Sequence, residues 1–194
     1  MKSIILILTI LFFSCNENKV DSTESIHSFI DNEIEGDVRI EILKKEKPSI
    51  FIEADILHQY NDKCPHIPRN RKKAKQDNGC TVLFGAVSAD LYNDDGNKAS
   101  VVYSDSAIIF NESDSVKAIG DVLIKSVKGY ELKTDEIVLY NDLKLVKSDD
   151  DVSFTSNNDD WLYGKGFWSN FDMTNFEILK PKGELGRLKW SLIH

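Results

Sequence analysis

The chain has 194 residues, of which 41% are hydrophobic and 10% aromatic, enough to bury a core in one sizeable domain. Its 24 Lys and Arg residues stand against 32 Asp and Glu residues, and the formal net charge of −8 makes the chain repel polyanions. These values exclude a wholly disordered chain and argue against a general nucleic-acid binder.

The N-terminus has the pattern of an export signal. Lys2 precedes an apolar run from Ile4 to Phe13, and Ser14-Cys15 follow directly. The run is too short for an ordinary transmembrane helix. A small residue before a cysteine resembles the lipobox of bacterial lipoproteins, although Phe12 stands where leucine is favoured. We therefore expect a lipoprotein signal peptide over residues 1–14 and lipidation of Cys15; a plain secretory signal or an uncleaved anchor is the alternative.

A polar, weakly patterned segment follows, and residues 15–35 are expected to form a flexible tether. The folded domain is predicted over residues 36–180, with a loop insertion at 62–81 and a C-terminal tail at 181–194. Extended runs at 50–61 and 82–97 are rich in β-branched and aromatic residues.

The loop insertion contains Cys64 and Cys80, which lie sixteen residues apart. An exported chain matures in an oxidising compartment, so a disulfide between them is expected. A metal site formed by Cys64, His66 and Cys80 is the rival interpretation, but it would have only three ligands. The loop also carries a basic cluster, which is either a solvated surface or a contact for lipid phosphates or the membrane: Arg69, Arg71, Lys72, Lys73 and Lys75.

An internal repeat begins at Ser100, and its register can be checked residue by residue. Ser104-Asp105 aligns with Thr134-Asp135 and Phe110-Asn111 with Tyr140-Asn141, each at an offset of 30 residues. A repeat of this length indicates stacked supersecondary units. Each unit reads as strand, turn, strand, turn.

The repeat predicts an all-β, mainly antiparallel domain of about nine to twelve strands. Alternation within each strand places apolar side chains on one face, and stacking would align them into an apolar trough between two curved sheets. A sealed β-sandwich core has the same pattern, so both interpretations remain open at this stage.

The chemistry of the remaining motifs favours no catalytic role. The four histidines are scattered, and the sequence contains no nucleophile motif, phosphate-binding loop or pair of catalytic acids. We predict a protein that is not an enzyme, with no catalytic residues, no bound metal and no cofactor. The tryptophans 161, 168 and 190 either cap the core or stack on sugar rings.

The repeated phrases, among them AIGDVLIKS, GYELKTDEIVLYNDLKLVKSDDDV and LYGKGFWSNFDMTNFEI, resemble the LptC family of lipopolysaccharide-export proteins over about residues 36–180. The resemblance implies a twisted antiparallel β-jellyroll, open along one side, that accepts lipopolysaccharide from an inner-membrane ABC transporter and passes it to a periplasmic bridge protein. It also implies sheet-edge pairing, with the transporter near residues 38–43 and the bridge protein near 161–179. Family members carry an N-terminal transmembrane helix, which the lipobox-like signal would replace here, anchoring the protein to the periplasmic side of the inner membrane.

Within this interpretation, the side chains expected to line the trough and bind lipid share one parity in the repeat. They are Val101, Tyr103, Ala107, Ile109, Val122, Ile124, Leu132, Ile137, Leu139, Val152, Phe154, Phe167 and Phe171. A lipid-anchored β-sandwich that binds glycans through tryptophan and aspartate side chains is the alternative function.

Overall fold

The described residues form nine β-strands and no helix. The computed structural model describes residues 30–61, 64, 79–110, 114–156, 158 and 160–182. The strands are β1 (Asn32–Lys44), β2 (Lys47–Tyr60), β3 (Cys80–Tyr92), β4 (Lys98–Phe110), β5 (Ser115–Ser126), β6 (Glu131–Tyr140), β7 (Leu145–Thr155), β8 (Trp161–Asn170) and β9 (Phe176–Lys182). The predicted all-β class is confirmed.

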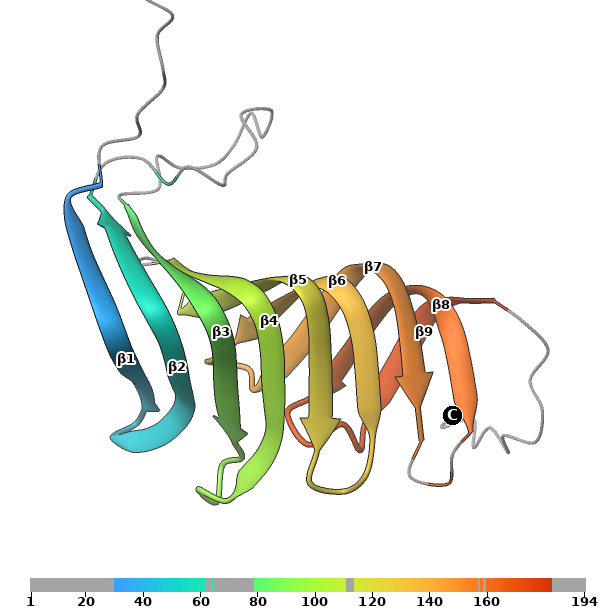
Figure 1. Cartoon of the computed structure of the whole chain (residues 1–194). Coiled ribbons are helices and arrows are strands. Elements are labelled where there is room, and N and C mark those ends of the chain that lie inside the picture. Colours follow the sequence, from blue (N-terminus) through green and yellow to red (C-terminus); the bar gives the residue numbers. More distant parts are fainter. Residues whose placement is uncertain are drawn as a thin grey trace, which may run out of the picture.

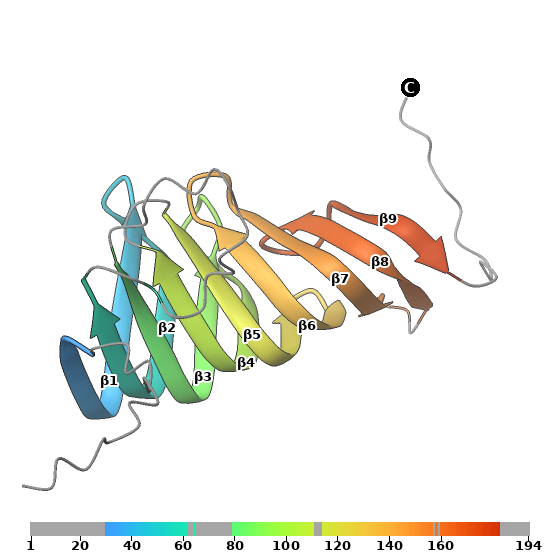
Figure 2. The same ribbon diagram turned by 90° about the horizontal axis from the view of Figure 1, so that it is seen from above.

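All nine strands belong to one antiparallel sheet, in which each strand pairs with its neighbours in the sequence from β1 to β9. Figure 2 shows them side by side along one axis, with β1 and β9 at opposite ends. The expectation of two separate sheets is therefore wrong. A single continuous sheet bends over on itself instead, as the arching strands in Figure 1 show.

The bend follows a line of register shifts that crosses the sheet near the middle of its strands. Between β3 and β4, Gly85-Ala86 of β3 lie opposite the single residue Asp105 of β4. Between β5 and β6, Gly120-Asp121 of β5 lie opposite the single residue Asp135 of β6. The two-residue corners have positive φ at both positions. Such bulges bend and twist the strands, which brings the two halves of the sheet face to face.

Glycine is required at this corner because neighbouring strands approach it closely. A Cβ on Gly85 would lie 2.6 Å from the Asp55 carboxylate of β2. A Cβ on Gly120 would overlap the Asp105 side chain of β4 in the same way. The corner therefore alternates between glycine on one strand and aspartate on the next, so that backbone and carboxylate pack together.

The ordered sheet begins earlier than predicted. β1 starts at Asn32, inside the segment expected to be a tether, because residues 32–35 pair with β2. The expected signal peptide, Cys15 and most of the tether lie outside the described residues, as does nearly all of the C-terminal tail. Within the described part of the chain, no helix is long and apolar enough to cross a membrane.

The two loop cysteines form a disulfide at the start of β3, with their Cα atoms 5.4 Å apart. Because the sulfurs are bonded to each other, the alternative metal site loses both of its thiolates. The disulfide belongs to a second apolar cluster, separate from the main core, that includes Tyr60, Val82 and Ile108. The basic cluster of this loop lies outside the described residues.

Candidate functional site

The interior between the two halves of the sheet is apolar along its whole length. One continuous cluster of buried side chains runs from Val38 on β1 to Ile178 on β9. Its largest members, such as Phe154, Phe167 and Leu132, have no more than 2% of their surface exposed. The interior is thus filled by side chains, and its apolar lining continues through every strand.

Most of the side chains predicted to line the trough meet in this cluster. Ile109 packs against it as a partly buried neighbour. The members of the cluster are Ala107, Val122, Ile124, Leu132, Ile137, Leu139, Val152, Phe154, Phe167 and Phe171.

Val101 and Tyr103 do not share this face. Tyr103 is 45% exposed, while Val102 between them is 2% exposed and belongs to the core. The single-residue corner at Asp105 is the physical reason, because one extra residue reverses which side chains of β4 point inward. The parity predicted for β4 is correct after the corner, at Ala107 and Ile109, and wrong before it.

The two ends of the interior differ in composition. Toward β9 it is aromatic: Phe154 and Phe176 have ring centroids 4.2 Å apart, and Phe167 and Tyr130 pack around them. Toward β1 it is aliphatic, with Ile40 and Ile42 partly buried against the core. In the described sheet, β1 pairs only with β2 and β9 only with β8, so each end presents an unpaired strand edge.

Hydrogen bonds join the two halves along the side opposite the bend, which we call the seam. Lys144, in the β6–β7 turn, donates through Nζ to Ser49 Oγ and, at 2.7 Å, to the Tyr92 carbonyl. Ser49 Oγ in turn donates to Asn141 Oδ1, and the Asn141 amide donates to the Leu43 carbonyl at 3.3 Å.

The seam continues beneath the other turns. Ser100 Oγ donates to the Phe171 carbonyl at 2.6 Å, and Ser126 Oγ donates to the Asp172 carbonyl at 2.7 Å. The seam therefore consists of polar contacts between turns and strand ends, whereas the interior behind it is apolar. Polar contacts of this kind are individually weak, since each contributes about 1 kcal/mol net.

Lys144 carries a buried charge at this seam. Its side chain is 9% exposed, and its Nζ lies 5.3 Å from the centroid of the Phe171 ring. Burial, and then repulsion from Lys44, lower the pKa of Lys144, while Asp94 acts against this shift. The two hydrogen bonds and the aromatic ring compensate part of the desolvation of the ammonium group.

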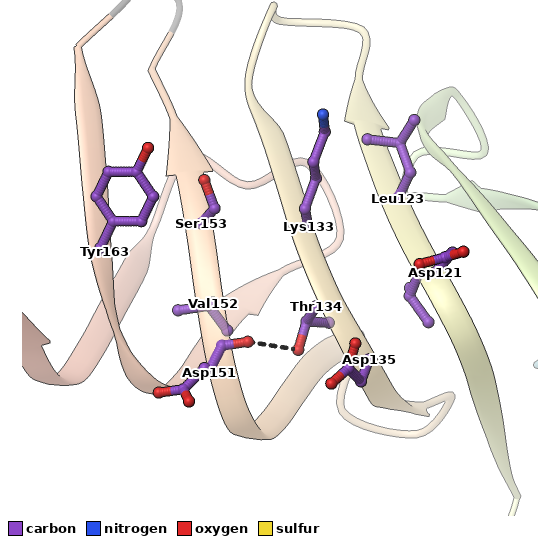
Figure 3. A pocket seen from close by; sticks show the side chains of 10 residues that line it. Asp121, Leu123, Lys133, Thr134, Asp135, Asp151, Val152, Ser153 and Tyr163 are labelled. Atoms are coloured by element: carbon purple, nitrogen blue, oxygen red, sulfur yellow. Dashed lines mark hydrogen bonds between the residues drawn. The ribbon is translucent and has the colours of Figure 1, made fainter.

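The outer face of the sheet carries a hollow of about 560 Å³ between β5 and β8. Figure 3 shows Leu123, Lys133, Ser153 and Tyr163 along one side of it and three aspartates along the other. Next to it, Trp161 is 59% exposed and stacks on Tyr163 with ring centroids 6.4 Å apart. Trp168 is instead partly buried, and its indole donates to Glu177 at 2.9 Å.

Sequence reasoning missed the seam. Asn141 and Lys144 read as ordinary turn residues, and their partner Ser49 lies 92 and 95 residues away. No local pattern links positions that far apart. The only available signal was a lysine in a turn between two apolar strands.

Comparison with known families identifies the chain. A family model described as "LptC: Lipopolysaccharide-assembly, LptC-related" matches residues 3–181. No curated protein matches the sequence.

Proposed function

This chain belongs to the LptC family and so takes part in lipopolysaccharide transport, and from that premise we propose that its bent sheet is a non-catalytic carrier for lipopolysaccharide acyl chains. It accepts the lipid from an inner-membrane ABC transporter and passes it to a periplasmic bridge protein. The observation that carries the proposal is the apolar interior that runs unbroken from β1 to β9.

The physical need for such a carrier follows from the hydrophobic effect. Exposing one chain of about fourteen carbons to water costs roughly 10 kcal/mol, at about 0.8 kcal/mol per methylene. Lipid A has several such chains, so free diffusion through water is too slow to be useful. An apolar interior removes this barrier, and the protein needs no chemistry of its own because ATP hydrolysis by the transporter drives the movement.

Acyl chains enter by parting the seam. The interior side chains are buried against one another, so lipid must separate the halves of the sheet and replace side-chain contacts with acyl contacts. The seam is the suitable place because it is closed by a few polar contacts between turns and strand ends, whereas the bend is a continuous backbone.

The unpaired edges supply the contacts with partners. Backbone groups on β1 pair with the periplasmic part of the transporter, and those on β9 pair with the bridge protein, which extends the apolar interior from one protein to the next. Lipidation of Cys15 would hold the chain at the inner membrane while residues 16–31 connect the anchor to β1.

Site-specific photocrosslinking in cells tests the carrier. Crosslinkers at the inward positions Ile124, Leu139 and Phe154 should capture lipopolysaccharide, because these side chains lie in the core. The matched outward neighbours Lys125 and Ser153 should capture little. Equal capture at both sets, in variants that still fold by circular dichroism, would contradict the assignment of the interior as the lipid site.

The exposed Trp161–Tyr163 pair favours a second candidate function, glycan binding on the outer face. Stacked aromatic rings beside aspartates suit the apolar face and hydroxyl groups of a sugar. In that case Trp161→Ala would abolish affinity for soluble glycans, and Trp168→Ala would have less effect because Glu177 already holds the Trp168 indole. Glycan affinity unchanged in Trp161→Ala would eliminate this candidate.

A further inference from the structure

A pocket of about 280 Å³ opens on the seam, at the end near β1. Four lysines line it: Lys44, Lys45 and Lys47 from the β1–β2 hairpin and Lys144 from the β6–β7 turn. Asp94 is the one acidic residue in its lining, and it lies 3.4 Å from Lys44. The pocket is therefore strongly basic on a chain whose net charge is −8.

The fold places the four lysines together, and within the lining Asp94 alone offsets their charge. Lys45 and Glu46 have positive φ, which forms the tight turn that places lysines on both of its sides. Lys144 is fixed by its bonds to Ser49 and the Tyr92 carbonyl. Crowding of the cations is unfavourable, since Lys44 contributes to lowering the pKa of Lys144. An incoming anion would relieve this repulsion.

We propose that this pocket binds a phosphate monoester group, and that the phosphate belongs to the lipid cargo. A phosphate monoester carries nearly two negative charges and three strong acceptor oxygens, whereas a carboxylate has one charge and two oxygens. The three hairpin lysines, Lys44, Lys45 and Lys47, match the charge and the three acceptor oxygens of a phosphate better than those of a carboxylate. The assignment of its source rests on the proposed carrier function.

The position of the pocket explains why the phosphate would be part of a lipid. Lys144 separates the pocket from the Phe171 ring, which belongs to the apolar core. Pro48, also in the lining, precedes the core residue Ile50 by two positions. A molecule with acyl chains in the interior and a phosphate at its head would thus place each part in matching surroundings, at the line where the seam opens.

Binding to the purified full-length chain tests the proposal. The variant Lys45→Gln/Lys47→Gln removes two pocket charges at exposed positions and leaves Lys144 intact. The control Lys125→Gln/Lys165→Gln makes the same charge change at exposed positions of β5 and β8. Titration calorimetry would use lipid A with its phosphates and lipid A from which both phosphates have been removed. Backbone amide shifts would report the binding of inorganic phosphate alone.

The pocket variant should lose about tenfold in affinity for phosphorylated lipid A, and the control less than twofold. Both should bind the dephosphorylated lipid as well as the wild type does. If inorganic phosphate shifts the amides of residues 44–47 but the lipid affinities of the two variants agree, the anion site stands and its source is free phosphate. If the two variants behave alike and inorganic phosphate shifts nothing, the pocket assignment is overturned.

The same experiment separates the two proposals. Binding of dephosphorylated lipid A to the wild type supports the carrier whatever happens at the pocket. If the wild type binds neither lipid, the carrier fails, while the inorganic phosphate titration still decides whether the lysines form an anion site.

Discussion

Lys144 combines three properties in one side chain. It is buried, it joins its turn to the ends of β2 and β3, and it lines a basic pocket. Buried lysines are costly unless hydrogen bonds compensate for lost hydration. Its presence places a buried charge at the seam, between the apolar interior and a pocket.

Replacement of Lys144 should change how stability depends on pH. Its pKa in the folded protein lies below its ordinary value of 10.5, so between these two values the unfolded chain binds more protons than the folded chain. The contribution of Lys144 to the free energy of unfolding therefore rises with pH through this window. In Lys144→Met that contribution is absent.

Urea unfolding of both proteins at several alkaline pH values measures this effect. The free energy of unfolding of the wild type minus that of Lys144→Met should increase as the pH is raised toward 10.5 and be constant at neutral pH. A difference that falls with pH, or does not change, would contradict the burial of a charged ammonium group.

At the level of the strand, the sequence predicts well which segments form strands. It predicts less well which side chains of a strand point into the core. The thirty-residue repeat correctly indicates antiparallel strands, and Ile124, Leu132 and Phe154 lie inward as expected. The facing of Val101 and Tyr103 was predicted wrongly because the Asp105 corner reverses the alternation, and hydropathy alone does not reveal a one-residue bulge. In β6 the apolar residues themselves change parity across a similar corner, from Leu132 to Ile137, and both lie in the core. Hydropathy therefore predicts the inward side chains of β6 correctly.

The corner predicts a difference between two glycines with similar backbone angles. Gly120 and Gly96 have φ of 85° and 83°, but a Cβ on Gly120 would overlap Asp105, whereas a Cβ on Gly96 would meet nothing within 4 Å. Gly96→Ala should cost about 1 kcal/mol through backbone strain, and Gly120→Ala about 3 kcal/mol through strain and steric overlap. Thermal or urea unfolding gives both values. Equal losses would show that the corner tolerates a side chain.

For the molecule as a whole, the sequence identifies an apolar interior but not how it closes. Both a trough and a sealed sandwich fit the alternation of residues. The seam depends on contacts between turns and strand ends that are distant in the sequence, such as Ser49 with Asn141. It is therefore a tertiary feature without a local signature, and the start of the ordered sheet at Asn32 was missed for a related reason, since it depends on pairing with β2.

Locking the seam should prevent lipid loading. Ser49→Cys with Asn141→Cys places two thiols where the wild-type side chains meet. Once oxidised, they should reduce lipopolysaccharide capture by a crosslinker at Leu139 at least severalfold, and a reductant should restore it. Each single cysteine variant is the control. Capture that is the same in the oxidised and reduced proteins would mean that lipid enters elsewhere, for example past β1.

The order of the strands has a consequence for how the chain acquires its shape. Each described strand pairs with the strand just before it in the sequence. As the chain emerges N-terminus first, each new strand can therefore pair with a strand that has already formed. No segment has to wait for a distant partner until the β6–β7 turn arrives to meet Ser49. The sheet should thus form progressively from β1 to β9, and the hydrogen bonds between its two halves should form last.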